Sequence, residues 1–150
     1  MSAGMVFVRK HPDVITRKSA SKLANTMLLL RFCEKRGSGI DYAIEAVEKQ
    51  GLPPVEFTRS EQHTGICLFP SKHFSEMSKE EKVMACYQHA CLLYESRKII
   101  NNTTVRERFG IDKNNAAVAS RIIADAVEAG FIKIKNNESK KFASYIPYYG

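Results

Sequence analysis

The feature that most restricts the fold is a long amphipathic segment between Gly110 and Gly130. Apolar residues recur through it at the spacing of an α-helix and fill an arc of about 180° at 100° per residue. Asp112 can cap a helix over residues 113–129, and Gly130 can end it. Such a helix needs neighbours that cover its apolar side. This side is formed by Val118, Ala119, Ile122, Ile123, Ala126 and Val127.

The neighbouring segments complete a recognisable order of elements. Ser78 and Glu81 form a capping box that predicts a helix over residues 79–97. Asn102 or Thr103 can then cap a short helix that runs through Phe109, and Gly110 can end it. After the amphipathic helix, FIKIK and KKFASYI flank the turn signal NNES and predict a β-hairpin. This order predicts a winged helix-turn-helix domain over residues 76–150.

The second side of the 113–129 helix suggests a way to contact DNA. A recognition helix enters the major groove with its N-terminal end. Small side chains there let the backbone approach, whereas Asn114 and Arg121 could read base edges. Lysines of the wing could contact phosphates. The predicted double-stranded DNA site consists of Lys113, Asn114, Ala117, Ser120, Arg121, Lys133, Lys135, Lys140 and Lys141.

The same pattern leaves a second interpretation open. Winged helices also serve as dimerisation or docking modules, and Asp125 and Glu128 lie on or near the solvent side of the helix. From residue 76 to the end, twelve basic residues oppose nine acidic ones, a surplus of only +3. A homodimer or a protein-docking module is therefore the alternative to a DNA-binding regulator.

The first half of the chain, residues 1–75, predicts two helices and a hairpin. Leu23, Met27 and Leu30 give a helical stripe from Ser19 up to a stop at Gly37. A second helix runs to Gln50 and is ended by the run Gly-Leu-Pro-Pro. VEFTR and TGICLFP around SEQH then predict a small antiparallel hairpin. The whole chain is therefore expected to be α+β, with a boundary near residue 75.

Gly37, Ser38 and Gly39 lie between the two predicted helices. Glycines at a helix N-terminus let an anion approach the backbone N–H groups. No GK[ST] follows and no strand precedes, so the segment is neither a P-loop nor a dinucleotide fingerprint. A junction between two helices explains these residues without any ligand.

The run LANTMLLLRFCEKRGSGIDYAIEAVEKQGLPPVEF resembles the bacterial family of RecG-like ATP-dependent helicase C-terminal proteins and transcriptional regulators. The parts that carry the resemblance are CEKRGSGI, GLPP and Phe57. Later, ACYQHACLLY, TVRERFGI and NAAVASRIIADAVEAGFIK resemble the C-terminal winged helix of that family. The resemblance covers roughly residues 19–147.

This resemblance implies a DNA-binding transcriptional regulator with a remnant of a histidine-kinase-type ATPase domain, in which Gly37, Ser38 and Gly39 are the glycine box. Full-length relatives carry an N-terminal Schlafen-type AlbA domain. The asparagine for Mg²⁺ and the aspartate for adenine would lie upstream of Met1. The chain is therefore expected to be a C-terminal fragment or a shortened gene product that binds ATP weakly at best. It lacks a Walker A lysine loop, so the resemblance does not imply a working helicase.

The charge of the chain agrees with a nucleic-acid partner, and its composition does not indicate a membrane span. The net charge is +7, and eight basic residues against two acidic ones lie before Gly37. No apolar run reaches the length of a membrane span, and the N-terminus has no signal-peptide pattern, so a cytoplasmic location is expected.

Neither a metal site nor a catalytic site is expected. The four cysteines form no CxxC pair, and we expect them to be reduced. His89 lies three residues after Cys86 on a predicted helix, but no third orienting group accompanies them, so a core or surface histidine is the favoured interpretation. The sequence therefore predicts a chain that is not an enzyme by itself.

Overall fold

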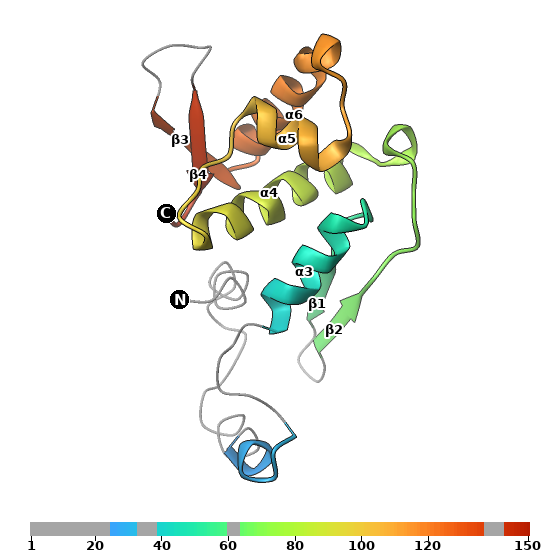
Figure 1. Ribbon diagram of the computed structural model, residues 1–150, viewed down its shortest axis with the longest axis vertical. Coiled ribbons are helices and arrows are strands. Elements are labelled where there is room, and N and C mark those ends of the chain that lie inside the picture. The colour runs from blue at the N-terminus through green and yellow to red at the C-terminus, as the bar shows by residue number, and fades with distance from the viewer. Residues whose placement is uncertain (1–24, 33–38, 60–63, 137–142) are drawn as a thin grey trace.

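The computed structural model describes residues 25–32, 39–59, 64–136 and 143–150, and these form a mixed α and β structure (Figure 1). The two sheets are separate and each has two strands. The expected α+β class is therefore confirmed. After a short helical stretch at residues 25–29, the elements are α3 (Gly39–Lys49), β1 (Glu56–Arg59), β2 (Thr64–Cys67), the 3-10 turn η1 (Phe74–Glu76), α4 (Lys79–Glu95), α5 (Asn102–Phe109), the 3-10 turn η2 (Lys113–Asn115), α6 (Ala116–Glu128), β3 (Ile132–Asn136) and β4 (Ser144–Pro147).

The first helix ends earlier than the sequence predicted. Arg31 adopts a left-handed conformation with a φ of 60°, and the N–H of Phe32 donates to the carbonyl of Met27 at 2.9 Å. This is a Schellman ending with arginine in the position that glycine usually takes. The predicted continuation to Gly37 was therefore wrong, because backbone hydrogen bonds close the helix at Arg31. Leu30 of the predicted stripe is 60% exposed.

The helix α3 and the hairpin share a small core. Ile44 and Val47 of α3 are buried together with Val55, and Leu92 of α4 packs against them. Gly51 has a φ of 65° and follows the last turn of α3, as predicted. The strands β1 and β2 are antiparallel, with Phe57 opposite Ile66. The predicted helix-hairpin arrangement is thus confirmed for residues 39–59 and 64–67.

The helix α4 lies at the centre of the molecule (Figure 1). It begins at the predicted capping box, where the N–H of Glu81 donates to Ser78 Oγ at 3.1 Å and the N–H of Ser78 donates to Glu81 Oε2 at 2.6 Å. From Ala85 to Cys91 every residue is buried. A helix buried on all sides needs contacts in every direction, and α4 packs against α3, α5, α6 and β4.

The next two helices differ from the prediction at their N-terminal ends. The predicted cap of α5, Asn102 or Thr103, was wrong, because Asn101 caps the helix by accepting from Thr104 N at 3.0 Å; Gly110 follows the helix with a φ of 63°. The predicted helix over residues 113–129 starts as the 3-10 turn η2, because the Asp112 side chain accepts from Asn114 N at 2.8 Å and tightens the first turn. The α-helical part begins at Ala116.

One side of α6 enters the main core, as the apolar stripe predicted. Ala119, Ile122, Ile123 and Ala126 are buried there with residues of α4. Val118 was assigned to this apolar side but is 37% exposed. It lies at the edge of the stripe and faces solvent, so this part of the prediction was wrong.

The strands β3 and β4 form the predicted C-terminal hairpin. Ile132 pairs with Pro147, and the register shifts between Ile134 and Asn136. An isolated bridge between Ile100 and Tyr145 connects the hairpin to the segment after α4. The order of elements after residue 76 is therefore the predicted one. The boundary near residue 75 stays a prediction, and packing between α3 and α4 crosses it.

Candidate nucleic-acid interface

The solvent side of η2 and α6 carries all five residues that were predicted for DNA contact on this helix. Each of them is exposed, whereas the opposite side of α6 lies in the core. Positions 117, 120, 121 and 124 follow each other at helical spacing, so they occupy one side of the helix. The five residues are Lys113, Asn114, Ala117, Ser120 and Arg121.

A hydrogen-bond network from α5 fixes one of these residues. The Nδ2 atom of Asn102 donates to Ser120 Oγ at 2.9 Å and to the carbonyl of Ala116 at 2.8 Å. In turn, Arg106 Nε donates to Asn102 Oδ1 at 2.9 Å. Asn102 therefore joins the N-terminal ends of α5 and α6 and holds the Ser120 hydroxyl beside α5.

Sequence reasoning missed Asn102 and Arg106 as part of this surface. Their spacing of four residues on a predicted helix was the available signal, since such pairs face each other. The contact from Asn102 to Ser120 spans 18 residues. A contact of that kind needs the packing of α5 on α6, which local patterns do not specify.

The hairpin contributes two of the four predicted lysines. Lys133 and Lys135 are exposed on β3 and alternate with Ile132, which is buried, and Ile134, which is 48% exposed. Lys140 and Lys141 lie outside the described residues. In Figure 1 the end of α6 that carries η2 projects at the top of the view, and β3 and β4 stand beside it.

The glycine segment is described only at its last residue. Gly39 begins α3, and a Cβ placed there would meet no atom within 4 Å. Among the described glycines, those with a positive φ are Gly51, Gly110 and Gly130. Neither backbone strain nor close packing thus requires a glycine at position 39. Gly37 and Ser38 lie outside the described residues.

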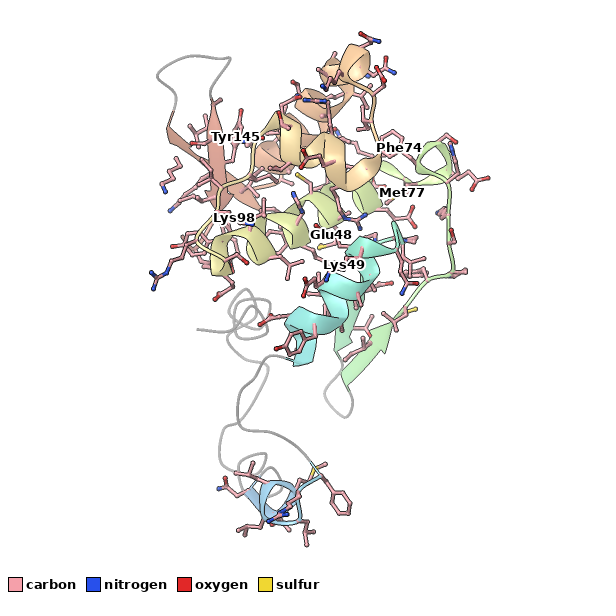
Figure 2. The ribbon with its side chains drawn as sticks, in the orientation of Figure 1. Glu48, Lys49, Phe74, Met77, Lys98 and Tyr145 are labelled. Atoms are coloured by element: carbon pink, nitrogen blue, oxygen red, sulfur yellow. The ribbon has the colours of Figure 1, made fainter. Side chains whose placement is uncertain are left out.

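A buried polar cluster joins α3 to α4 and α5. His89 Nδ1 lies 2.6 Å from Glu48 Oε1, and Arg108 Nε lies 3.5 Å from Glu48 Oε2. The Arg108 side chain is only 4% exposed and also donates through Nη2 to the carbonyl of Leu52 at 2.9 Å. Figure 2 shows Glu48 between α3 and the helices above it.

Burial lowers the pKa of Arg108 and the nearby Glu48 carboxylate opposes that shift. Of the two sequence interpretations of His89, a core or a surface histidine, its burial shows the first. Its partner is Glu48 rather than Cys86. The cluster therefore connects elements of the two halves.

The described cysteines are free thiols, with Cys67 exposed and Cys86 and Cys91 buried. Burial raises the pKa of Cys86 to about 12, and that of Cys91 also to about 12. Among the described residues there is no group of three or more potential metal ligands. Within the same residues, no helix has the length and apolarity that a membrane span requires.

Comparison with known proteins gives a family match for the first half of the chain. No curated protein matches it, and neither does any solved structure. Residues 2–68 match the family described as "Putative ATP-dependent DNA helicase recG C-terminal". This match ends one residue after β2 and includes the CEKRGSGI and GLPP segments. Over these residues, the chain is similar to the family of putative ATP-dependent DNA helicase recG C-terminal proteins.

Proposed function

We propose that the chain is part of a DNA-binding transcriptional regulator and that residues 76–150 act as a winged helix-turn-helix. The observation that carries the proposal is the division of α6 into a buried apolar side and an exposed side without acidic residues from Lys113 to Arg121. A helix that enters the major groove of double-stranded DNA has one side packed on the protein core and the other side exposed.

The chemistry of the exposed residues fits the major groove. Arg121 can bind guanine O6 and N7, and Asn114 can bind adenine N6 and N7. Ala117 and Ser120 are small, so they let the helix lie close to the base edges. Lys133 and Lys135, with Lys140 and Lys141 in the intervening segment, can contact phosphates. The net charge of +7 supports an electrostatic attraction to DNA.

Fluorescence anisotropy with labelled duplexes of random sequence tests this proposal. We expect a Kd of about 1–100 µM near physiological salt, and an affinity that falls steeply between 50 and 200 mM salt. Arg121→Glu should weaken binding by at least about tenfold. Lys98→Glu is the matched control, because it makes the same charge change on an exposed residue beyond the C-terminal end of α4.

Two results would contradict DNA binding. One is an absence of binding up to about 0.1 mM protein, the weak end of ordinary non-specific affinity. The other is an equal loss of affinity in Arg121→Glu and Lys98→Glu, which would indicate that only net charge matters.

A docking or homodimerisation module is the second candidate. Val118 and Ile134 support it, because these apolar side chains are 37% and 48% exposed on the surface assigned to DNA. Analytical ultracentrifugation of the wild type and of Arg121→Glu distinguishes the candidates. A stable dimer that Arg121→Glu dissociates would favour docking over DNA binding.

Nucleotide binding at Gly37, Ser38 and Gly39 is a weaker proposal that rests on the family description. We expect no catalysis by this chain alone. Calorimetry with ATP and Mg²⁺ tests nucleotide binding: a saturable heat of binding would support it, and no heat at millimolar nucleotide would remove it.

A further inference from the structure

A cavity of about 480 Å³ lies where the first hairpin meets the start of α4. Phe57 and Phe69 line it from the hairpin side, and Met84 and Tyr87 line it from α4. Phe131, which directly precedes β3, completes the wall. Aromatic rings and a thioether of this kind offer a large apolar contact area. The volume is in the range of ordinary binding sites.

A second cavity of about 460 Å³ continues the first. The two share Glu80, Met84 and Phe131 in their walls, so they lie end to end along the first turns of α4. The second extends to Asp125 and Glu128 at the C-terminal end of α6. We refer to the two cavities together as the α4 groove.

The rim of the α4 groove is acidic on a protein that is basic overall. Five carboxylates line it, and two of these form ion pairs: Glu81 with Lys72 at 2.9 Å, and Asp125 with Lys79 at 2.9 Å. Among the described residues, Glu56, Glu80 and Glu128 form no direct ion pair with lysine or arginine, although Lys79, which lines the second cavity, attracts Glu80 and Glu128. The groove therefore has a negative surplus, against a net charge of +7 for the chain.

Hydrogen bonds favour the ionised form of two of these carboxylates, Glu80 and Glu81. Hydrogen bonds from the backbone and from Ser78 lower the pKa of Glu80, and the hydrogen bond from Lys72 lowers the pKa of Glu81. An acidic rim repels a phosphate backbone, so this surface does not suit DNA. It attracts a cation that also carries apolar groups, because aromatic faces and carboxylates both favour that combination.

We propose that the α4 groove binds a basic, apolar peptide segment of a partner protein. Its leucine-like or aromatic side chains would fill the space between Phe57, Met84 and Phe131, and its lysines or arginines would face Glu80 and Glu128. A peptide fits better than a compact ligand because the two cavities adjoin, and Glu56 lines the first whereas Glu128 lines the second. This site is separate from the proposed DNA surface.

A fluorescein-labelled decapeptide that alternates arginine and leucine is a direct probe. Titrated with the full chain in anisotropy measurements, it should bind with a Kd of about 1–100 µM, and a decapeptide that alternates glutamate and leucine should not bind. Glu80→Lys and Glu128→Lys should each weaken binding by at least about tenfold. Glu107→Lys is the matched control, because Glu107 is exposed on α5 and lines neither cavity.

Several outcomes would overturn the proposal. They are the absence of saturable binding up to about 1 mM, an equal effect of Glu107→Lys, and unchanged binding in both groove variants. Displacement of the peptide by butylammonium at a similar concentration would also overturn it in favour of a small amine ligand. Thermal melts show whether each variant folds, and Glu128→Lys tests the site if Glu80→Lys destabilises α4. The same groove variants should still bind duplex DNA. Failure of the peptide proposal can therefore be distinguished from failure of the DNA proposal.

Discussion

Single buried polar side chains hold the two halves of the described structure together. Gln88 of α4 is 3% exposed and hydrogen-bonds both backbone groups of Val55, donating from Nε2 to the carbonyl at 2.6 Å and accepting from the N–H at Oε1 at 3.2 Å. The Gln88 amide therefore satisfies the backbone N–H and carbonyl of Val55, just before β1, as a neighbouring strand would. A buried amide in this role cannot be replaced by an apolar residue of similar size.

Replacement of Gln88 by leucine should lower the free energy of unfolding by about 2–4 kcal/mol, because both backbone groups of Val55 would be left buried and unpaired. Urea denaturation followed by circular dichroism measures the change. Gln50→Leu, at an exposed position after α3, is the matched control and should change stability by less than about 0.5 kcal/mol. Equal effects of the two substitutions would contradict the role of Gln88.

The buried thiols provide a second test at the residue scale. With pKa values raised to about 12, Cys86 and Cys91 are thiolate in only about one molecule in 10,000 at pH 8. Among the described cysteines, iodoacetamide should therefore modify the exposed Cys67 first, and Cys86 and Cys91 only after unfolding. Peptide mapping by mass spectrometry identifies the sites. Rapid modification of Cys91 in the native protein would contradict the burial described here.

At the scale of elements, the contact of α3 with α4 and α5 depends on Glu48. Removing one partner of a buried ion pair leaves the other charge without compensation, so Glu48→Ala should cost about 3 kcal/mol of stability. Glu45→Ala is the control, because its ion pair with Lys49 lies on the surface of the same helix and contributes under about 1 kcal/mol. Similar losses in both variants, measured by urea denaturation, would show that the cluster is not important.

The start of α4 should depend on pH. The pKa of Glu81 is lowered from 4.5 by the hydrogen bonds from Lys72 and Ser78, so the folded state favours the ionised carboxylate. Its contribution to stability is present above about pH 4.5 and is lost as the pH falls through the lowered folded value. Urea midpoints from pH 3 to 7 should fall less at the acid end in Glu81→Gln than in the wild type. An unchanged acid slope would contradict this assignment.

The sequence predicted elements well wherever a local signal fixed them. The capping box at Ser78 and the left-handed glycine at 110 lie at the predicted ends of α4 and α5, because caps act over three or four residues. The early end at Arg31 was missed, since an arginine in the left-handed region has no clear sequence signal. The 3-10 start of α6 was also missed, because it depends on how the Asp112 side chain bonds.

The exposure of the candidate site residues could be predicted from the sequence, but the contacts that hold them in place could not. The 3.6-residue period placed Asn114 and Arg121 on the solvent side, and both are exposed. The link from Asn102 to Ser120 and the Glu48 cluster join distant parts of the chain. Contacts of this kind follow from the packing of helices on each other, and composition or spacing within one helix does not specify them.

At the scale of the whole molecule, the described structure carries two surfaces of opposite charge. The exposed side of η2 and α6 is basic and polar, whereas the α4 groove is apolar with an acidic rim. The helix α6 contributes to both, with its N-terminal end on the first and Asp125 and Glu128 on the second. The arrangement would let the chain contact DNA and a basic protein segment at the same time.

The most direct test of the central proposal is a nuclear magnetic resonance titration of the ¹⁵N-labelled chain with duplex DNA. We expect the largest amide shifts at residues 113–121 and at Lys133 and Lys135, with the shifts reduced by added salt. Amides around the α4 groove should shift little. Shifts confined to other parts of the chain, or no shifts at millimolar duplex, would contradict DNA binding through α6 and the β3–β4 hairpin.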